Sequence, residues 1–166
     1  MNASFLDHTF DLSFPENLDP KSTAYLNGKF LALEEAKVSV LDRGFLFADG
    51  IYEVVPVYQR SPFLWTNHLR RLVRSLAAIQ LACPFHEEDW TELVHRMIDH
   101  QPFDDQFIYL QITRGSARRD HAFPQTVRPT VFAMASEFHR PSQADREKGL
   151  KAITVDDERW LRCDIK

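Results

Sequence analysis

Lys166 is the residue of this sequence that most clearly combines a reactive side chain with an apolar approach. It follows a segment, 150–161, that is rich in Leu, Ile, Val and Trp. A lysine that leaves bulk water has its ammonium form disfavoured, and its neutral amine is then a nucleophile that forms a Schiff base with a carbonyl group. The alternative is a solvated charge, which is the commoner state of a lysine. This segment alone leaves both interpretations open.

A cluster of cationic side chains is the second feature that could do chemistry. Arg114, Arg118, Arg119 and His121 fall within residues 114–121 of a chain whose formal net charge is −4. A guanidinium group binds a carboxylate through two parallel hydrogen bonds, and a neighbouring imidazole adds a donor. The spacing therefore indicates either a carboxylate-binding loop or a solvated basic loop.

Arg71 is the third candidate, because it follows His68 by three positions on a predicted helix. Arg70 points about 100° away on the same helix and is expected to be solvated. For Arg71 itself, the alternative is a surface arginine whose aliphatic stem covers apolar residues.

The elements that must position these side chains follow from turn signals and hydrophobic periodicity. Asn27-Gly28, between two short apolar stretches, predicts a hairpin over 24–31. Asn67 is the predicted N-cap of a helix that ends before Pro84. The remaining predicted elements are an irregular loop over 42–50, a helix over 87–99, and strands over 37–40, 51–58, 106–113, 130–135 and from 150 onward.

Periodicity also predicts burial. The strand over 106–113 is apolar on both faces, which favours a central position in the sheet, whereas Pro56 favours an edge or a bulge. The predicted buried face of the second helix consists of Trp90, Leu93, Val94, Met97 and Ile98.

The pattern predicts an α/β protein with two domains. Residues 1–22 form an N-terminal arm, and 23–137 form a small domain with a mixed sheet and two helices. Polar residues over 138–147 indicate a linker, and 148–166 begin a larger second domain.

Composition restricts the class of protein. The net charge of −4 argues against a general nucleic-acid binder, and no apolar run is as long as a membrane span. The N-terminus lacks the features of a secretory signal, and two cysteines, Cys83 and Cys163, make no disulfide framework, so we expect a cytoplasmic protein. His95 and His100 are five residues apart and do not share a helical face, so we expect no metal site.

Four stretches, taken together and in order, resemble the fold-type IV pyridoxal-phosphate aminotransferases, and most closely their D-amino acid transaminase branch. The resemblance covers about residue 25 to residue 166. The stretches are Asp-Arg-Gly-Phe-Leu-Phe-Ala-Asp-Gly-Ile-Tyr-Glu-Val-Val at 42–55, Asn-His-Leu-Arg-Arg-Leu at 67–72, Thr-Arg-Gly-Ser-Ala-Arg-Arg-Asp-His-Ala-Phe-Pro at 113–124 and Glu-Arg-Trp-Leu-Arg-Cys-Asp-Ile-Lys at 158–166.

The resemblance implies a role for each candidate. Lys166 would hold pyridoxal phosphate as a Schiff base and move the substrate proton, and Arg71 would bind the cofactor phosphate. Tyr52 would donate its hydroxyl in the same subunit. Arg119 and His121 would bind the substrate carboxylate in the active site of the partner subunit, which implies a homodimer.

The implied reaction is ping-pong transamination between D-amino acids, such as D-alanine, D-glutamate or D-aspartate, and 2-oxo acids. Within the same fold, the alternatives are a branched-chain L-amino acid transaminase and an aminodeoxychorismate lyase. Arg119 and His121 together favour the D-amino acid enzyme. A third possibility, from another class, is a non-catalytic module that binds small molecules.

The resemblance also implies that the polypeptide continues past Lys166. In the family, the second half of the chain supplies the acidic partner of the pyridine nitrogen, further phosphate ligands and much of the large domain. An intact mass near 19.4 kDa would contradict this expectation.

Overall fold

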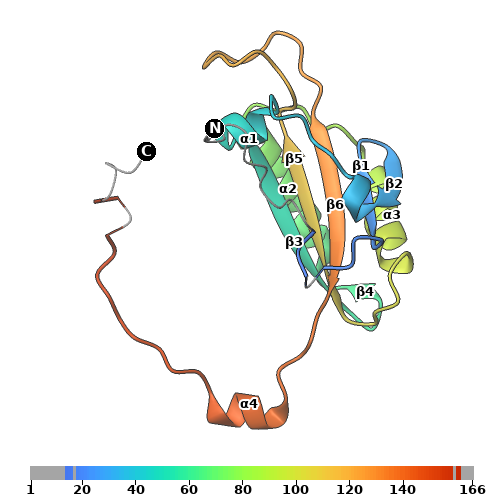
Figure 1. Cartoon of the computed structure of the whole chain (residues 1–166), viewed down its shortest axis with the longest axis vertical. Helices are drawn as coiled ribbons and strands as arrows, with labels where there is room; N and C mark the ends of the chain where they lie inside the picture. The colour runs from blue at the N-terminus through green and yellow to red at the C-terminus, as the bar shows by residue number, and fades with distance from the viewer. Residues whose placement is uncertain (1–13, 17, 159, 162–166) are drawn as a thin grey trace, which may run out of the picture.

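The computed structural model describes residues 14–16, 18–158, 160 and 161. A six-stranded sheet carries two long helices on one face (Figure 1). The strands are β1 (Thr23–Leu26), β2 (Lys29–Ala32), β3 (Gly50–Tyr58), β4 (Ser61–Pro62), β5 (Gln106–Thr113) and β6 (Thr130–Glu137), in the sheet order β2-β1-β6-β5-β3-β4. The helices are α1 (Arg43–Phe47), α2 (Trp65–Ala78), α3 (Glu87–Asp99) and α4 (Gln143–Lys148), and the 3₁₀ turn η2 covers Leu33–Glu35.

The connections explain the direction of the strands. After β3 and the short β4, helix α2 runs back along the sheet and α3 returns, so β5 begins beside the end of β3 and pairs with it in the antiparallel sense. The other described strand pairs are antiparallel as well. The predicted α/β fold with two helices on a sheet is confirmed, but the sheet is antiparallel throughout its described pairs and not mixed.

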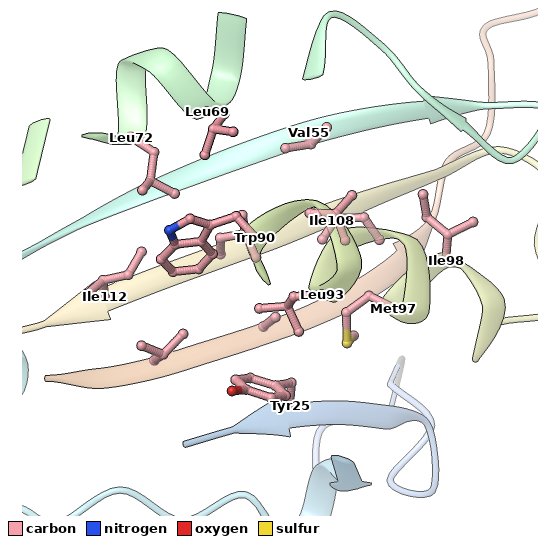
Figure 2. Packing of buried hydrophobic residues seen from close by; sticks show 14 of the residues in the cluster. Tyr25, Val55, Leu69, Leu72, Trp90, Leu93, Met97, Ile98, Ile108 and Ile112 are labelled. Atoms are coloured by element: carbon pink, nitrogen blue, oxygen red, sulfur yellow. The ribbon is translucent and has the colours of Figure 1, made fainter. Parts of the chain in front are cut away.

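The core lies between the helices and one face of the sheet. Alternate residues of β5, namely Ile108, Leu110 and Ile112, are fully buried on this face. They meet α2 and α3, and the ring of Trp90 lies among them (Figure 2). The predicted buried face of α3 is confirmed at all five positions. The opposite face of the sheet carries half-buried residues such as Tyr109, which alternate with the core residues.

The predicted β1–β2 hairpin is confirmed. Asn27 and Gly28 both have positive φ, 48° and 95°, as a two-residue turn of this kind requires. The turn also contacts β6, the neighbour of β1 in the sheet, because the side-chain oxygen of Asn27 accepts from the backbone N–H of Val131 at 2.8 Å. β1 is thereby held against β6.

Four other predictions differ from the structure. The predicted irregular loop over 42–50 contains helix α1, whose N-cap Asp42 accepts from the backbone N–H of Gly44. Residues 37–40 form no strand, and α2 begins at Trp65 with Leu64 as its N-cap, so Asn67 lies inside the helix. Residues 150–158 also form no strand, and their apolar side chains, including Ile153 at 88%, are exposed. A strand needs hydrogen bonds to a neighbour, and within the described part of the chain this segment has no partner strand.

The predicted linker contains α4, a short helix that begins with a reciprocal capping pair. Ser142 accepts from the backbone of Asp145, and the Asp145 side chain accepts from the backbone of Ser142. No residue of α4 is buried. Among the described helices, none is long and apolar enough to cross a membrane.

Candidate active site

Glu53 forms the centre of a polar network between β3 and α2. Because side chains alternate along a strand, Glu53 faces the helices while its neighbour Tyr52 faces the other side of the sheet. The Glu53 side chain is 2% exposed. Its carboxylate accepts hydrogen bonds from Nε and Nη2 of Arg71 at 2.6 and 2.5 Å, and its Oε2 lies 2.9 Å from Nδ1 of His68. A forked arginine–carboxylate pair of this kind fixes the plane of the guanidinium group.

The electrostatics of this network favour the charged forms of both partners. Burial opposes ionisation of Glu53, but the hydrogen bonds from Arg71 and His68 outweigh it and lower the pKa of Glu53. The hydrogen bond and charge of Glu53 raise the pKa of Arg71, and Tyr52 adds a smaller contribution in the same direction. Arg71 is therefore a permanent cation whose position is set by a buried anion.

Arg71 remains available to a ligand. Its side chain is 54% exposed, and in the described structure Nη1 makes no hydrogen bond. A guanidinium group that is fixed on one side and free on the other can bind a phosphate or a carboxylate. The geometry thus fits the phosphate of pyridoxal phosphate.

Tyr52 lies on the opposite face of β3 and is 65% exposed. Its ring stacks on that of Tyr109, with the ring centroids 5.8 Å apart and the planes 23° apart. The Tyr109 hydroxyl donates to Oε1 of Gln111 at 3.0 Å, and burial, with a smaller contribution from Tyr52, raises the pKa of Tyr109. Tyr52 is therefore held by its ring, while most of its surface faces solvent.

The outer edge of β3 separates these two groups. β4 pairs only with Val57 and Tyr58, so the rest of the edge has no neighbouring strand in the described structure. Tyr52 lies on one face of the sheet, and Arg71, bound to Glu53, lies on the other.

Arg119 and His121 lie together in the loop between β5 and β6, beyond the end of the sheet and beside α1 (Figure 1). Both are exposed, and both contact the ring of Phe47. The Cζ atom of Arg119 is 5.4 Å from the ring centroid, and the His121 ring centroid is 5.5 Å from it. Among the described residues, neither forms a hydrogen bond or an ion pair with Tyr52 or Arg71.

Of the sequence candidates, the structure brings together Arg119 and His121, which share the ring of Phe47, whereas Tyr52 and Arg71 lie on opposite faces of the sheet. Lys166 lies outside the described residues, so its role stays a prediction. Within the described residues, there is no group of three or more His, Cys, Asp or Glu side chains that could hold a metal ion.

Glu53 and His68 are parts of this site that the sequence interpretation did not single out. The sequence did contain a signal. Glu53 alternates with the apolar residues Ile51 and Val55, so all three lie on the inward face of the strand. A buried carboxylate requires a cationic partner, and His68 and Arg71 are three apart on one face of the next helix.

Comparison with known proteins identifies the family. A family model described as class IV amino-transferase matches residues 50–166, which include Tyr52, Arg71, Arg119 and His121. The chain belongs to the class IV aminotransferase family. Its fold is that of the fold-type IV enzymes, as the sequence resemblance predicted.

Curated and solved relatives agree with this assignment. The D-alanine aminotransferase of Staphylococcus haemolyticus is 43% identical over 143 residues, which are 86% of this chain and 50% of that protein. The branched-chain amino acid aminotransferase of Escherichia coli has a TM-score of 0.67 at 18% identity, over 71% of this chain and 41% of that one.

A third relative extends the range of activities found on this fold. The 4-amino-4-deoxychorismate lyase of Pseudomonas aeruginosa has a TM-score of 0.62 at 22% identity, over 76% of this chain and 44% of that chain. At these identities the solved structures show the fold alone. The chain spans about half the length of the curated relatives it matches.

Proposed function

We propose that the complete protein is a pyridoxal-phosphate-dependent transaminase that acts on D-amino acids. The observation that carries the proposal is the presence of an oriented, half-exposed Arg71 and of the exposed Arg119 and His121 in a chain that is 43% identical over 143 residues to a D-alanine aminotransferase. The first cation suits the cofactor phosphate, and the second pair suits a substrate carboxylate.

Different residues of this chain would bind the cofactor and the substrate. Arg71, held by Glu53, would bind the phosphate through its free Nη1, and Tyr52 would direct its hydroxyl toward the substrate side of the site. The cofactor, when bound, withdraws electrons from the α-carbon of the amino acid. Lys166 would remove the proton from that carbon and return a proton to C4′ of the cofactor.

The balance of the reaction follows from two half-reactions. In the first half-reaction the site would bind the D-amino acid and, with water supplying the carbonyl oxygen, release a 2-oxo acid. In the second half-reaction a different 2-oxo acid would receive the amino group, water would be released, and a new amino acid would leave. The substrates alternate on one site, so initial-rate plots should show ping-pong kinetics.

We also propose that the site is shared between two subunits of a homodimer. Within the described structure, Arg119 and His121 make no hydrogen bond or ion pair with Tyr52 or Arg71. A site that uses all four side chains would then draw Arg119 and His121 from a second subunit. A loop that extends past the end of its own sheet can reach a neighbouring subunit. Arg119 and His121 would then serve the active site of the partner subunit.

The domain organisation and location remain part of the same proposal. Residues 1–22 would be an arm, 23–137 the small domain and 138–147 the linker. Residues 148–166 would begin the large domain, whose strands would pair with the exposed segment after α4. Few cysteines and the metabolic reaction favour the cytoplasm.

The test is a comparison of donors with the complete, cofactor-loaded enzyme. Transfer of an amino group from D-alanine to 2-oxoglutarate, with little or none from L-leucine, is the expected result. A preference for L-leucine would contradict the proposal and indicate a branched-chain L-amino acid transaminase instead. Release of pyruvate from 4-amino-4-deoxychorismate would instead indicate the lyase.

A further inference from the structure

Helix α1 holds the loop that carries Arg119 and His121. The buried side chain of Arg43, on α1, donates from Nη1 to the backbone oxygen of Asp120 at 2.6 Å and to that of Ala122 at 3.4 Å. These two carbonyl groups flank His121 in the sequence. Arg43 therefore fixes the backbone on both sides of this residue.

Phe47, one turn further along α1, contacts the side chains of the same loop. Its ring lies 5.4 Å from the Cζ atom of Arg119 and 5.5 Å from the ring of His121, measured to the centroids. The Cζ atom of Arg43 is also 4.7 Å from the Phe47 centroid. Residues four apart on a helix are neighbours, so the loop backbone and the loop side chains are held from one helical face.

Arg43 is itself fixed by buried partners. Its Nε donates to Asp49 at 2.7 Å, and Arg114 donates to the same carboxylate from Nε and Nη2 at 2.8 and 3.0 Å. Arg114 also donates to the backbone oxygens of Ile79 and Gln80 at the end of α2. Burial opposes the ionisation of Asp49, but the two arginines outweigh it and lower its pKa. The support for the loop therefore extends into the core.

The first residues of the loop between β5 and β6 are bound to the N-terminal end of α1. The backbone N–H of Arg43 donates to the carbonyl of Gly115 at 2.9 Å, and Asp42 and Ser116 form an antiparallel bridge. Gly115 has a φ of 82°, and a Cβ atom there would lie 1.9 Å from the backbone oxygen of Arg128. A side chain is excluded at this point, so the first residues of the loop follow a single path.

We propose that α1 is a positioning element for substrate recognition. Phe47 would set the relative orientation of Arg119 and His121, and Arg43 would set the height of the loop above the sheet. This inference rests on the proposed function, because it assumes that Arg119 and His121 bind the substrate carboxylate. It predicts that a change at Phe47 acts on carboxylate binding and leaves cofactor binding unchanged.

The test uses the complete, cofactor-loaded enzyme with Phe47→Leu, which keeps an apolar side chain but removes the aromatic face. A cation over an aromatic ring contributes enough for about a twofold to fivefold change in affinity at an exposed site. We therefore expect KM for D-alanine and the inhibition constant of propionate to rise by this factor. The kcat value and the dissociation constant of the cofactor should stay unchanged.

Two variants distinguish positioning from general loosening of the helix. Phe47→Tyr retains the aromatic face, so its KM should equal that of the wild type. Phe45→Leu removes a ring that is 75% exposed on the same helix, and it should leave KM and the inhibition by propionate unchanged. A purely structural role would lower the thermal stability and cofactor content of Phe47→Leu and leave the propionate constant unaltered.

The outcomes separate the two proposals. If wild-type enzyme fails to transaminate D-amino acids, the proposed function is wrong. If the wild type is active and inhibited by propionate, but Phe47→Leu matches it in KM and in the propionate constant, the positioning role is wrong. Equal effects of Phe45→Leu and Phe47→Leu would also overturn it.

Discussion

Replacing Glu53 by Gln tests whether the buried carboxylate orients Arg71. The change removes the charge but keeps the size of the side chain, and it places an amide NH₂ among the donors of Arg71 and His68. Breaking a fully buried ion pair costs about 3–5 kcal/mol because the remaining charge is stranded. Arg71 is 54% exposed and regains water, so we expect a loss of about 1–3 kcal/mol in the free energy of unfolding.

The same change should weaken binding of the cofactor. With Glu53 in place, the Arg71 side chain has already lost much of its rotamer freedom before the phosphate arrives. Without it, this ordering must occur on binding, at a cost of roughly 1 to 1.4 kcal/mol, which is fivefold to tenfold in Kd. Urea unfolding measures the first effect, and titration of the apoenzyme with pyridoxal phosphate measures the second.

Glu92→Gln is the matched control. Glu92 is 68% exposed and pairs with Arg96 one turn along α3, so its loss should change stability by less than about 0.5 kcal/mol. The account of Glu53 would be refuted if both variants had the same stability and the same cofactor Kd as the wild type.

Two further predictions concern pH and the core. Because the pKa values of Glu53 and Asp49 are lowered in the folded state, their contribution is complete above the unfolded values of about 4.3 and 3.9 and is lost as pH falls through the folded values. Stability should therefore decline in acid, with a shallower decline in Glu53→Gln; an unchanged pH profile would contradict the assignment. Leu72→Ala removes a fully buried side chain from α2 and should cost about 2–5 kcal/mol in urea unfolding. Val73→Ala, at a site 38% exposed, should cost much less, and equal costs would place Leu72 outside the core.

The fold could be predicted wherever the local pattern and the tertiary partners agree. The predicted bounds of α3 and β5 match the structure because each combines a clear period with a clean boundary. Asn67 was misplaced as an N-cap because Leu64 adopts a positive φ of 50°, a turn that no residue preference indicates. The exposed apolar segment after α4 has a strand pattern, but strand formation depends on a neighbour that local sequence does not supply.

The site was predicted only in part. A family resemblance assigned a role to each of Tyr52, Arg71, Arg119 and His121, and these roles stay predictions. Glu53 was missed because its importance depends on burial and on Arg71, which the fold brings to it from the next helix. The role of α1 was missed for the same reason, since the contacts between its side chains and the loop join residues that are far apart in the sequence.

The most direct measurement is the visible absorption of the complete, cofactor-loaded protein before and after addition of D-alanine. The account predicts a protein-bound cofactor band that is lost on addition of D-alanine and recovers with a 2-oxo acid, and in Lys166→Ala this band is replaced by that of the free aldehyde. A band that responds only to L-amino acids would contradict the proposed specificity. If no protein-bound band remained after incubation with pyridoxal phosphate and removal of the unbound cofactor, the proposed function itself would be contradicted.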